Sequence, residues 1–353
     1  MLRTFAKRDR LTAVKSPLFA IVRSGPPSGP KVAVAAIVAV AALSPWNALA
    51  ADATPTFPTK PIRMVSATAP GSQPDYIARL LIQKMSDAWG KPVIMDNRTG
   101  GGGLLASSLV AKAAPDGHTL LYVLPNFVIS PALQPTVTFP AVSEFVGIGQ
   151  IGFSTNILVA SPSIGVKGIK DFIALAKSQQ GKLIIASTGA GTAGHLSGTR
   201  FNLLAGIKAV QVAYKGGPEV MIELISGRSH YAVTTMGSAL PFITEGKLTA
   251  LAVTTPRRAP VLPDVPSLGE IQPEFRQSET SHGLLAPVGT PRAILHQISR
   301  EVARELELPD IREKLNAISF VIAPSTPEAY DKIVREQMNL ISTLVVAAGL
   351  RGK

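Results

Sequence analysis

Short apolar runs alternate with segments of helical period from Pro61 to the end of the chain. Ile62–Ser66 is mostly apolar, has the length of a strand and ends in a Pro/Gly turn. In Asp75–Trp89, which follows, Ile77 and Leu81 recur at the spacing that puts them on one face of a helix. Such alternation predicts an α/β fold with largely parallel sheets.

The same reasoning extends along the rest of the chain. Further strands are predicted at Pro92–Asp96, His118–Leu124, Asn156–Ala160, Lys182–Ser187, Val210–Tyr214, Tyr231–Thr235, Leu248–Thr254 and Gly283–Pro287. Further helices are predicted at Leu104–Ala113, Ile169–Lys177 and Glu219–Ile225, and from Thr290 and Thr326 onward. The stretch Thr255–Gln277 is rich in proline and charge, which predicts a surface loop.

The first 50 residues have the pattern of a secretion signal. A basic region precedes an apolar run of 12 residues from Val32 to Leu43, and Ala48-Leu49-Ala50 fits a small-x-small cleavage site. The run is shorter than the roughly 20 residues that span a bilayer. We therefore expect a signal peptide over residues 1–50 and export to the periplasm by the general secretory route; an uncleaved anchor or a buried helix is the alternative.

Composition limits the chemistry of the chain. Its 353 residues suffice for two domains, and the absence of cysteine excludes disulfides, thiolate metal sites and a cysteine nucleophile. Without residues 1–50, 28 of the 35 Lys and Arg and 22 of the 23 Asp and Glu remain, a net charge of +6. So mild an excess can steer an anion, but no clustered basic stripe with aromatic residues predicts nucleic-acid binding.

Two strand-to-helix junctions are candidate ligand sites. In open α/β sheets a ligand binds beyond the carboxyl ends of the strands, and free N–H groups at a helix N-terminus bind anions there. The first junction is the turn Ala69–Asp75. Asp75 is predicted either to face a ligand or simply to cap the helix.

The second junction, Ser187–Leu196, contains a literal G-x-G-x-x-G at Gly189, Gly191 and Gly194. A dinucleotide site is disfavoured, because the motif lies in the middle of the chain and the acidic residue expected about 20 positions later is missing. The glycines still expose backbone N–H groups, and Ser187, Thr188 and Thr192 add hydroxyls. The turn is thus suited to hold a carboxylate.

Catalytic patterns are missing from the sequence. The five histidines are scattered without metal-ligand spacing, and no G-x-S-x-G motif occurs. We therefore expect no enzyme, no metal and no cofactor. His195 could contact a ligand or be satisfied by the backbone at a helix start. Lys215, followed by two glycines, could reach the cleft or lie solvated on a turn.

A series of motifs in fixed order resembles the Bug family of tripartite tricarboxylate transporter (TctC-like) receptors. The resemblance covers nearly all of the chain after the leader. Its motifs are Phe57–Arg63, Pro70-Gly71 with Asp75, Ala78–Leu80, Asn97-Arg98 with the glycine run, Pro115–Leu121, Gly181–Leu183, Gly189–Thr192 with His195-Leu196, Tyr214–Gly216, Gly246–Leu248, Ala250–Thr254, Leu262–Pro266 and Ala286–Pro291.

The resemblance implies a type II periplasmic binding protein, or Venus-flytrap, fold with crossover strands between two α/β lobes. Lobe one would comprise residues 56–158 and 282–353, and lobe two residues 159–281. The ligand would be a small organic acid, and the protein would be a monomer. Its partner would be an inner-membrane permease of the tripartite type or, alternatively, a two-component sensor kinase. The implied ligand-binding residues are Pro70, Gly71, Ser72, Asp75, Ser187, Gly191, Thr192 and His195, with Tyr214 and Lys215 nearby.

The chain departs from the family pattern at four places. The usual second glycine after Pro70-Gly71 is Ser72, and the proline after Tyr214-Lys-Gly comes one place early, at Pro218. Gly227–His230 lacks the usual acidic residue, and His118 replaces the usual tyrosine. These changes leave the ligand's identity open.

Overall fold

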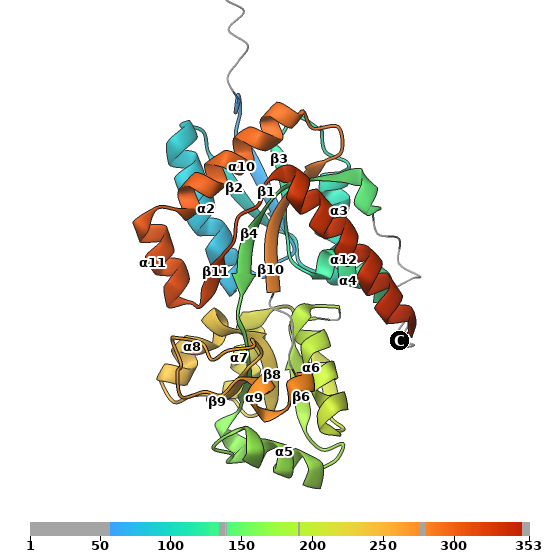
Figure 1. The fold of residues 1–353 in the computed structure, drawn as a ribbon, viewed down its shortest axis with the longest axis vertical. Helices are drawn as coiled ribbons and strands as arrows, with labels where there is room; N and C mark the ends of the chain where they lie inside the picture. The colour runs from blue at the N-terminus through green and yellow to red at the C-terminus, as the bar shows by residue number, and fades with distance from the viewer. Residues whose placement is uncertain (1–56, 134–137, 139, 190, 276–279, 348–353) are drawn as a thin grey trace, which may run out of the picture. The chain divides into compact units, whose positions relative to one another are not determined.

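The computed structural model describes residues 57–133, 138, 140–189, 191–275 and 280–347. Within them the chain forms two separate β-sheets, each covered by helices (Figure 1). The predicted signal peptide lies outside the described residues. No helix in the described part combines the length and apolar character that crossing a lipid bilayer requires.

The first sheet has six strands in the order β11-β4-β10-β3-β1-β2. β1, β2 and β3 are parallel, while β10 runs antiparallel to both β3 and β4. The strands are β1 (Ile62–Ser66), β2 (Val93–Asn97), β3 (Thr119–Val123), β4 (Phe145–Ser154), β10 (Thr280–Pro287) and β11 (Phe320–Ile322).

Alternating side chains on β1 build a core on each face of this sheet. Met64 is buried in one core with Ile77 and Leu81, which lie on the helix that follows β1. Val65 is buried in the opposite core. The first core is covered by α2 (Gln73–Trp89), α10 (Arg292–Leu306) and α11 (Pro309–Ala317), and the second by α3 (Leu104–Ala111), α4 (Asn126–Leu133) and α12 (Pro327–Ala347).

The second sheet has five strands in the order β7-β6-β8-β5-β9. β6 is parallel to β7 and β8, and β5 is antiparallel to β8 and β9. The strands are β5 (Asn156–Ala160), β6 (Ile184–Ser187), β7 (Val210–Ala213), β8 (Tyr231–Thr235) and β9 (Thr249–Val253). One core packs against α5 (Ile169–Ser178) and α6 (Ala193–Ala205), the other against α7 (Gly217–Ile225) and α8 (Met236–Thr244).

The chain crosses between the sheets on extended strands. β4 ends at Ser154 and β5 begins at Asn156, so the chain enters the second sheet through Thr155. It pairs with the first sheet again from Thr280, at the start of β10. Crossing strands were predicted and are present. The residue limits predicted for the two lobes, 158/159 and 281/282, stay a prediction.

One predicted loop contains regular structure. Within Thr255–Gln277 the residues Leu268–Ile271 form a short helix, α9. Ser267 caps it, because its side chain accepts from the Gly269 N–H over 3.1 Å while its own N–H donates to Glu270 over 3.0 Å. This reciprocal cap supplies the backbone hydrogen-bond partners that make a single turn stable within the proline-rich stretch.

Candidate functional site

One cleft collects the N-terminal ends of six helices. β1, β2, β3, β6, β7 and β8 are each followed by a helix, and the first residue or the N-cap of every one of these helices lines the cleft. Their N–H groups have no partner within the helix, so each end carries partial positive charge. The lining residues concerned are Ser72 (α2), Gly103 (α3), Asn126 (α4), Thr192 (α6), Gly216 (α7) and Thr235 (α8).

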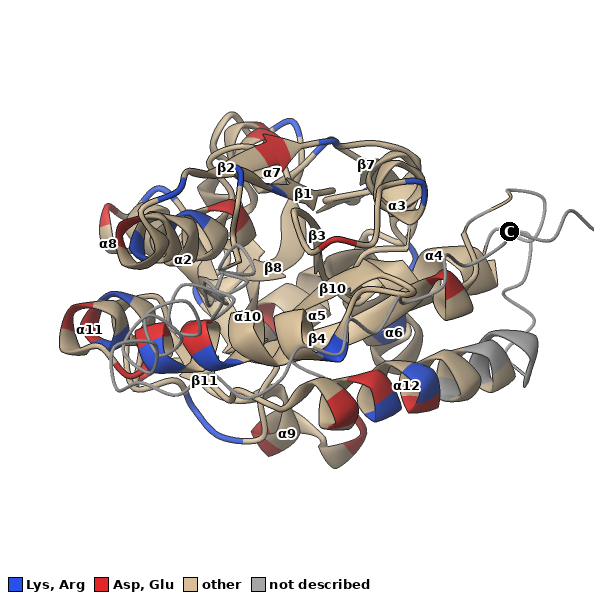
Figure 2. Ribbon diagram, turned by 90° about the horizontal axis from the view of Figure 1, so that it is seen from above, with Lys and Arg blue, Asp and Glu red and all other residues tan. Residues whose placement is uncertain are grey.

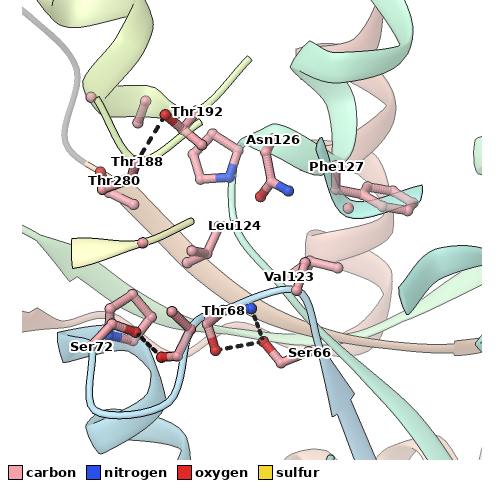
Figure 3. Close-up of a pocket in the computed structure, with 18 of the residues that line it drawn as sticks. Ser66, Thr68, Ser72, Val123, Leu124, Asn126, Phe127, Thr188, Thr192 and Thr280 are labelled. Carbon is pink, nitrogen blue, oxygen red and sulfur yellow. Dashed lines mark hydrogen bonds between the residues drawn. The ribbon is translucent and has the colours of Figure 1, made fainter. Parts of the chain in front are cut away.

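The cleft has room for a small organic molecule. Its volume is about 120 Å³, roughly ten times the ~10–15 Å³ that one water needs. Hydroxyls from both sheets face the space together with apolar groups, as Figure 3 shows for Ser66, Thr68, Thr188 and Leu124. The cleft therefore offers hydrogen bonds and an apolar wall to the same ligand.

Formal charge is nearly absent from the cleft. Among the described residues that line it, Lys215 is the one charged side chain. Charged residues of both signs instead lie along outer helices such as α11 and α12 (Figure 2). No carboxylate is among the described lining residues, so the helix N-termini and Lys215 favour a negatively charged group in the cleft.

The turn between β1 and α2 is held by its own side chains. Asp75 is 2% exposed and accepts hydrogen bonds from the Gly71 N–H, Arg79 Nε and Asn97 Nδ2, each over 2.9 Å. Burial alone would raise the pKa of Asp75, but these hydrogen bonds hold it below its usual value. Asp75 is thus an anion that fixes the turn, and it does not line the cleft.

The turn before α6 is organised around Thr192. Its hydroxyl donates to the Gly189 carbonyl over 2.8 Å and accepts from the His195 N–H over 3.3 Å. The His195 Nδ1 accepts from the Gly191 N–H over 3.4 Å, and burial lowers the pKa of His195. Burial thus favours the neutral form of His195, and Thr192 caps the start of α6 where this turn lines the cleft.

Tyr214 and Lys215 differ in role although they are adjacent. The Tyr214 hydroxyl bonds Glu223 Oε2 over 3.3 Å and Ser229 Oγ over 3.1 Å, and the residue does not line the cleft. Lys215 lines it, and its backbone N–H donates to Glu219 over 2.8 Å. Of this pair, Lys215 is the residue among the described lining residues of the cleft.

The structure brings the two predicted turns to the same cleft. Ser72, Thr192 and Lys215 line it. The other predicted residues are not among its described lining residues: Pro70, Gly71, Asp75, Ser187, Gly191, His195 and Tyr214. Ligand contact by all ten predicted residues stays a prediction.

Sequence reasoning missed several lining residues. Gly103, Asn126 and Thr235 begin helices after β2, β3 and β8, so the rule that found the two turns could have found them as well. Asn156 and Thr280 also line the cleft. No sequence signal marks these two, because they meet only where the strands cross.

The two lobes touch beside the cleft. A Cβ built on Gly216, before α7, would lie 2.3 Å from the Ala69 Cβ, after β1. A Cβ on Gly191 would lie 2.6 Å from Ser130 Oγ. Gln73 at the start of α2 accepts from the Gly237 N–H over 3.2 Å. Helix N-termini of both lobes are thus held close together around one space.

Within the described residues no group of three or more His, Asp or Glu is placed to hold a metal ion.

A family model described as "Tripartite tricarboxylate transporter family receptor" matches residues 77–350. A UPF0065 protein from the tcbD–tcbE intergenic region of Pseudomonas sp. strain P51 is 32% identical over 292 residues, 82% of this chain and 87% of that protein. BugT of Bordetella pertussis is 27% identical over 301 residues, 84% of this chain and 92% of BugT.

Solved structures show the same architecture. The periplasmic binding protein BugD has a TM-score of 0.80 and 27% identity, covering 84% of this chain and all of BugD. Rpa4515 of R. palustris with adipate has a TM-score of 0.80 and 26% identity over 84% of this chain and 100% of that one. MatC from Rhodopseudomonas palustris with bound malate has a TM-score of 0.76 and 28% identity, covering 82% of this chain and 100% of MatC. The predicted two-lobed periplasmic binding protein fold is confirmed.

Proposed function

The chain belongs to the tripartite tricarboxylate transporter receptor family, and from that premise we propose that it captures a small carboxylate in the periplasm for a permease of the tripartite type. The observation that carries the proposal is the convergence of six helix N-termini on a cleft with no described acidic lining residue. Backbone N–H groups at helix starts bind carboxylates without a countercharge. The family and the fold are those of solute-binding proteins.

Among the predicted residues, the proposed carboxylate contacts are Lys215 and the helix starts marked by Ser72 and Thr192, whose own hydroxyls already donate to the Ala69 and Gly189 carbonyls. Ser72 and Thr192 are the N-caps of helices in opposite lobes, and Lys215 adds the one cation among the described lining residues. Two relatives were solved with the dicarboxylates malate and adipate. Dicarboxylates are therefore the first ligands to test here.

Capture proceeds by closure of the lobes. A carboxylate that bonds amides of both lobes contacts more donors when the lobes are together, and that differential contact favours the closed form. Closure also removes the acid from water, which strengthens its hydrogen bonds to the helix N-termini.

A thermal-shift screen with malate, adipate, citrate and benzoate tests the proposal. At a concentration of 100 Kd, a ligand that binds only the folded protein adds about 2.7 kcal/mol to its stability, so at least one acid should raise Tm by several degrees. If the folded protein shows no shift with any acid, the proposal is wrong. Product formed from a bound acid, followed by NMR, would indicate an enzyme instead.

Export and partner are tested in cells. The mature protein recovered from the periplasm should begin at Ala51, after the proposed cleavage at Ala50. Deleting the gene should abolish uptake of the labelled acid that binds. Unchanged uptake, with loss of an acid-dependent phosphorylation response, would instead assign the protein to a sensor kinase.

A further inference from the structure

Asn156 and Thr280 form a buried part of the cleft wall, where the chain crosses between the sheets. Asn156 is the first residue of β5 and Thr280 the first of β10, and their exposed fractions are 1% and 4%. Thr280 Oγ1 donates to Asn156 Oδ1 over 3.1 Å. This bond ties the two crossing strands together.

The amide nitrogen of Asn156 has no hydrogen-bond partner among the described residues. Buried amide donors are nearly always paired, because leaving one unpaired forfeits its hydration without compensation. Thr280 already occupies Oδ1, so Nδ2 is the polar atom that Asn156 can still offer to the cleft. A free donor beside several helix N-termini is suited to a negatively charged oxygen.

We propose that Asn156 is a ligand-binding residue whose Nδ2 donates a hydrogen bond to a carboxylate oxygen of the bound acid. The inference rests on the proposed function and extends it from the helix ends to the crossing strands. The acid then contacts both lobes and also the segment that joins them. Occupancy of the cleft is thereby coupled to the position of the crossing.

Asn156→Asp and Asn156→Ala test the inference by calorimetric titration of the purified protein with malate and adipate. Asp keeps the size of the side chain and an oxygen that accepts from Thr280, but it replaces the donor with a negatively charged oxygen. Each variant should weaken binding about 10-fold or more, the effect of losing a hydrogen bond to a charged group. If one variant fails to fold, the other decides.

Thr254→Val is the matched control. Thr254 Oγ1 donates to the backbone oxygen of Asn156 over 3.3 Å and is buried, but the residue does not line the cleft. The substitution removes a hydrogen bond at the crossing without changing the amide donor. It should leave acid affinity within about twofold, as expected for a site that shares no contact with the ligand.

The side-chain amide resonance of Asn156, assigned by its loss in Asn156→Ala, gives a second readout. It should shift when malate or adipate is added to the wild-type protein. If wild type binds an acid while both variants bind it equally well and the amide does not shift, Nδ2 does not contact the acid and the inference is wrong. If wild type binds none of the screened acids, the proposed function fails, and this inference with it.

Discussion

The contact between the lobes beside the cleft depends on a glycine, and the proposed closure requires that contact. Gly216 has φ 171°, an extended conformation open to any residue, so Gly216→Ala strains no backbone. The new Cβ would lie 2.3 Å from the Ala69 Cβ, against about 3.5–4.0 Å for ordinary carbon contacts. The lobes would have to move apart by more than about 1 Å at this point, given that contact distance.

In the proposed closure mechanism, this cost falls on the closed state, in which the two lobes touch. Crowding of this kind costs about 1–3 kcal/mol, which lowers acid affinity about 5- to 150-fold if closure is needed for binding. Calorimetric titration with the acid found in the screen measures the loss. Gly168→Ala is the control, because Gly168 is also extended, at φ −172°, and a Cβ there meets nothing within 4 Å.

A double variant separates closure from direct obstruction of the ligand. Ala69→Gly removes the atom that the new Cβ meets, so Ala69→Gly with Gly216→Ala should recover most of the affinity. Wild-type affinity in Gly216→Ala would refute the closure argument. Failure of the double variant to recover would show instead that the methyl group blocks the acid.

Three further predictions concern charged residues. Glu305 is fully buried, and burial with the nearby charge of Glu301 raises its pKa to about 9, above about 4.5 when unfolded. The free energy of unfolding should therefore fall as pH rises from about 4.5 to 9, by up to about 1.4 kcal/mol per pH unit. In thermal melts at a series of pH values, Glu305→Gln should not show this pH dependence. Asp75→Asn should lower the free energy of unfolding by about 1–3 kcal/mol at pH 7, because it breaks the hydrogen bonds that hold its turn. Since the pKa of Asp75 is lowered in the folded protein, the stability difference between wild type and variant in denaturant melts should vanish as pH falls below that pKa. A stability difference that stays constant with pH would contradict the assignment. Lys215→Gln should weaken acid binding about threefold to tenfold at low salt and less at high salt, and a loss that does not change with salt would argue against a charge contact.

Local patterns predicted most strands of both sheets but not β4 or the three-residue β11. The sequence of β4 carries Gly147, Gly149 and Gly152, which disfavour a strand when read locally. In the fold, a Cβ on Gly149 would lie 2.8 Å from the Ser325 carbonyl oxygen, and one on Gly147 would lie 2.8 Å from the Asp331 nitrogen. Because these glycines have no side chain, Ser325 and the start of α12 can lie against β4. No local sequence pattern predicts this contact.

Part of the candidate site was predictable from local sequence, and part was not. Ser72, Thr192 and Lys215 lie in the turns that follow β1, β6 and β7, so the rule that ligands bind at strand carboxyl ends finds them from sequence. Asn156 and Thr280 are separated by 124 positions and meet only at the crossing. Their contact depends on how two sheets are joined, and neither periodicity nor spacing encodes that.

A crystal structure with the acid that gives the greatest thermal shift is the most direct measurement. The acid's carboxylate should lie within hydrogen-bond distance of N–H groups at the starts of α6 and α7, with lobe-one donors on its other side. An acid bound elsewhere, or one held in the cleft without any helix N-terminus near its carboxylate, would contradict the account.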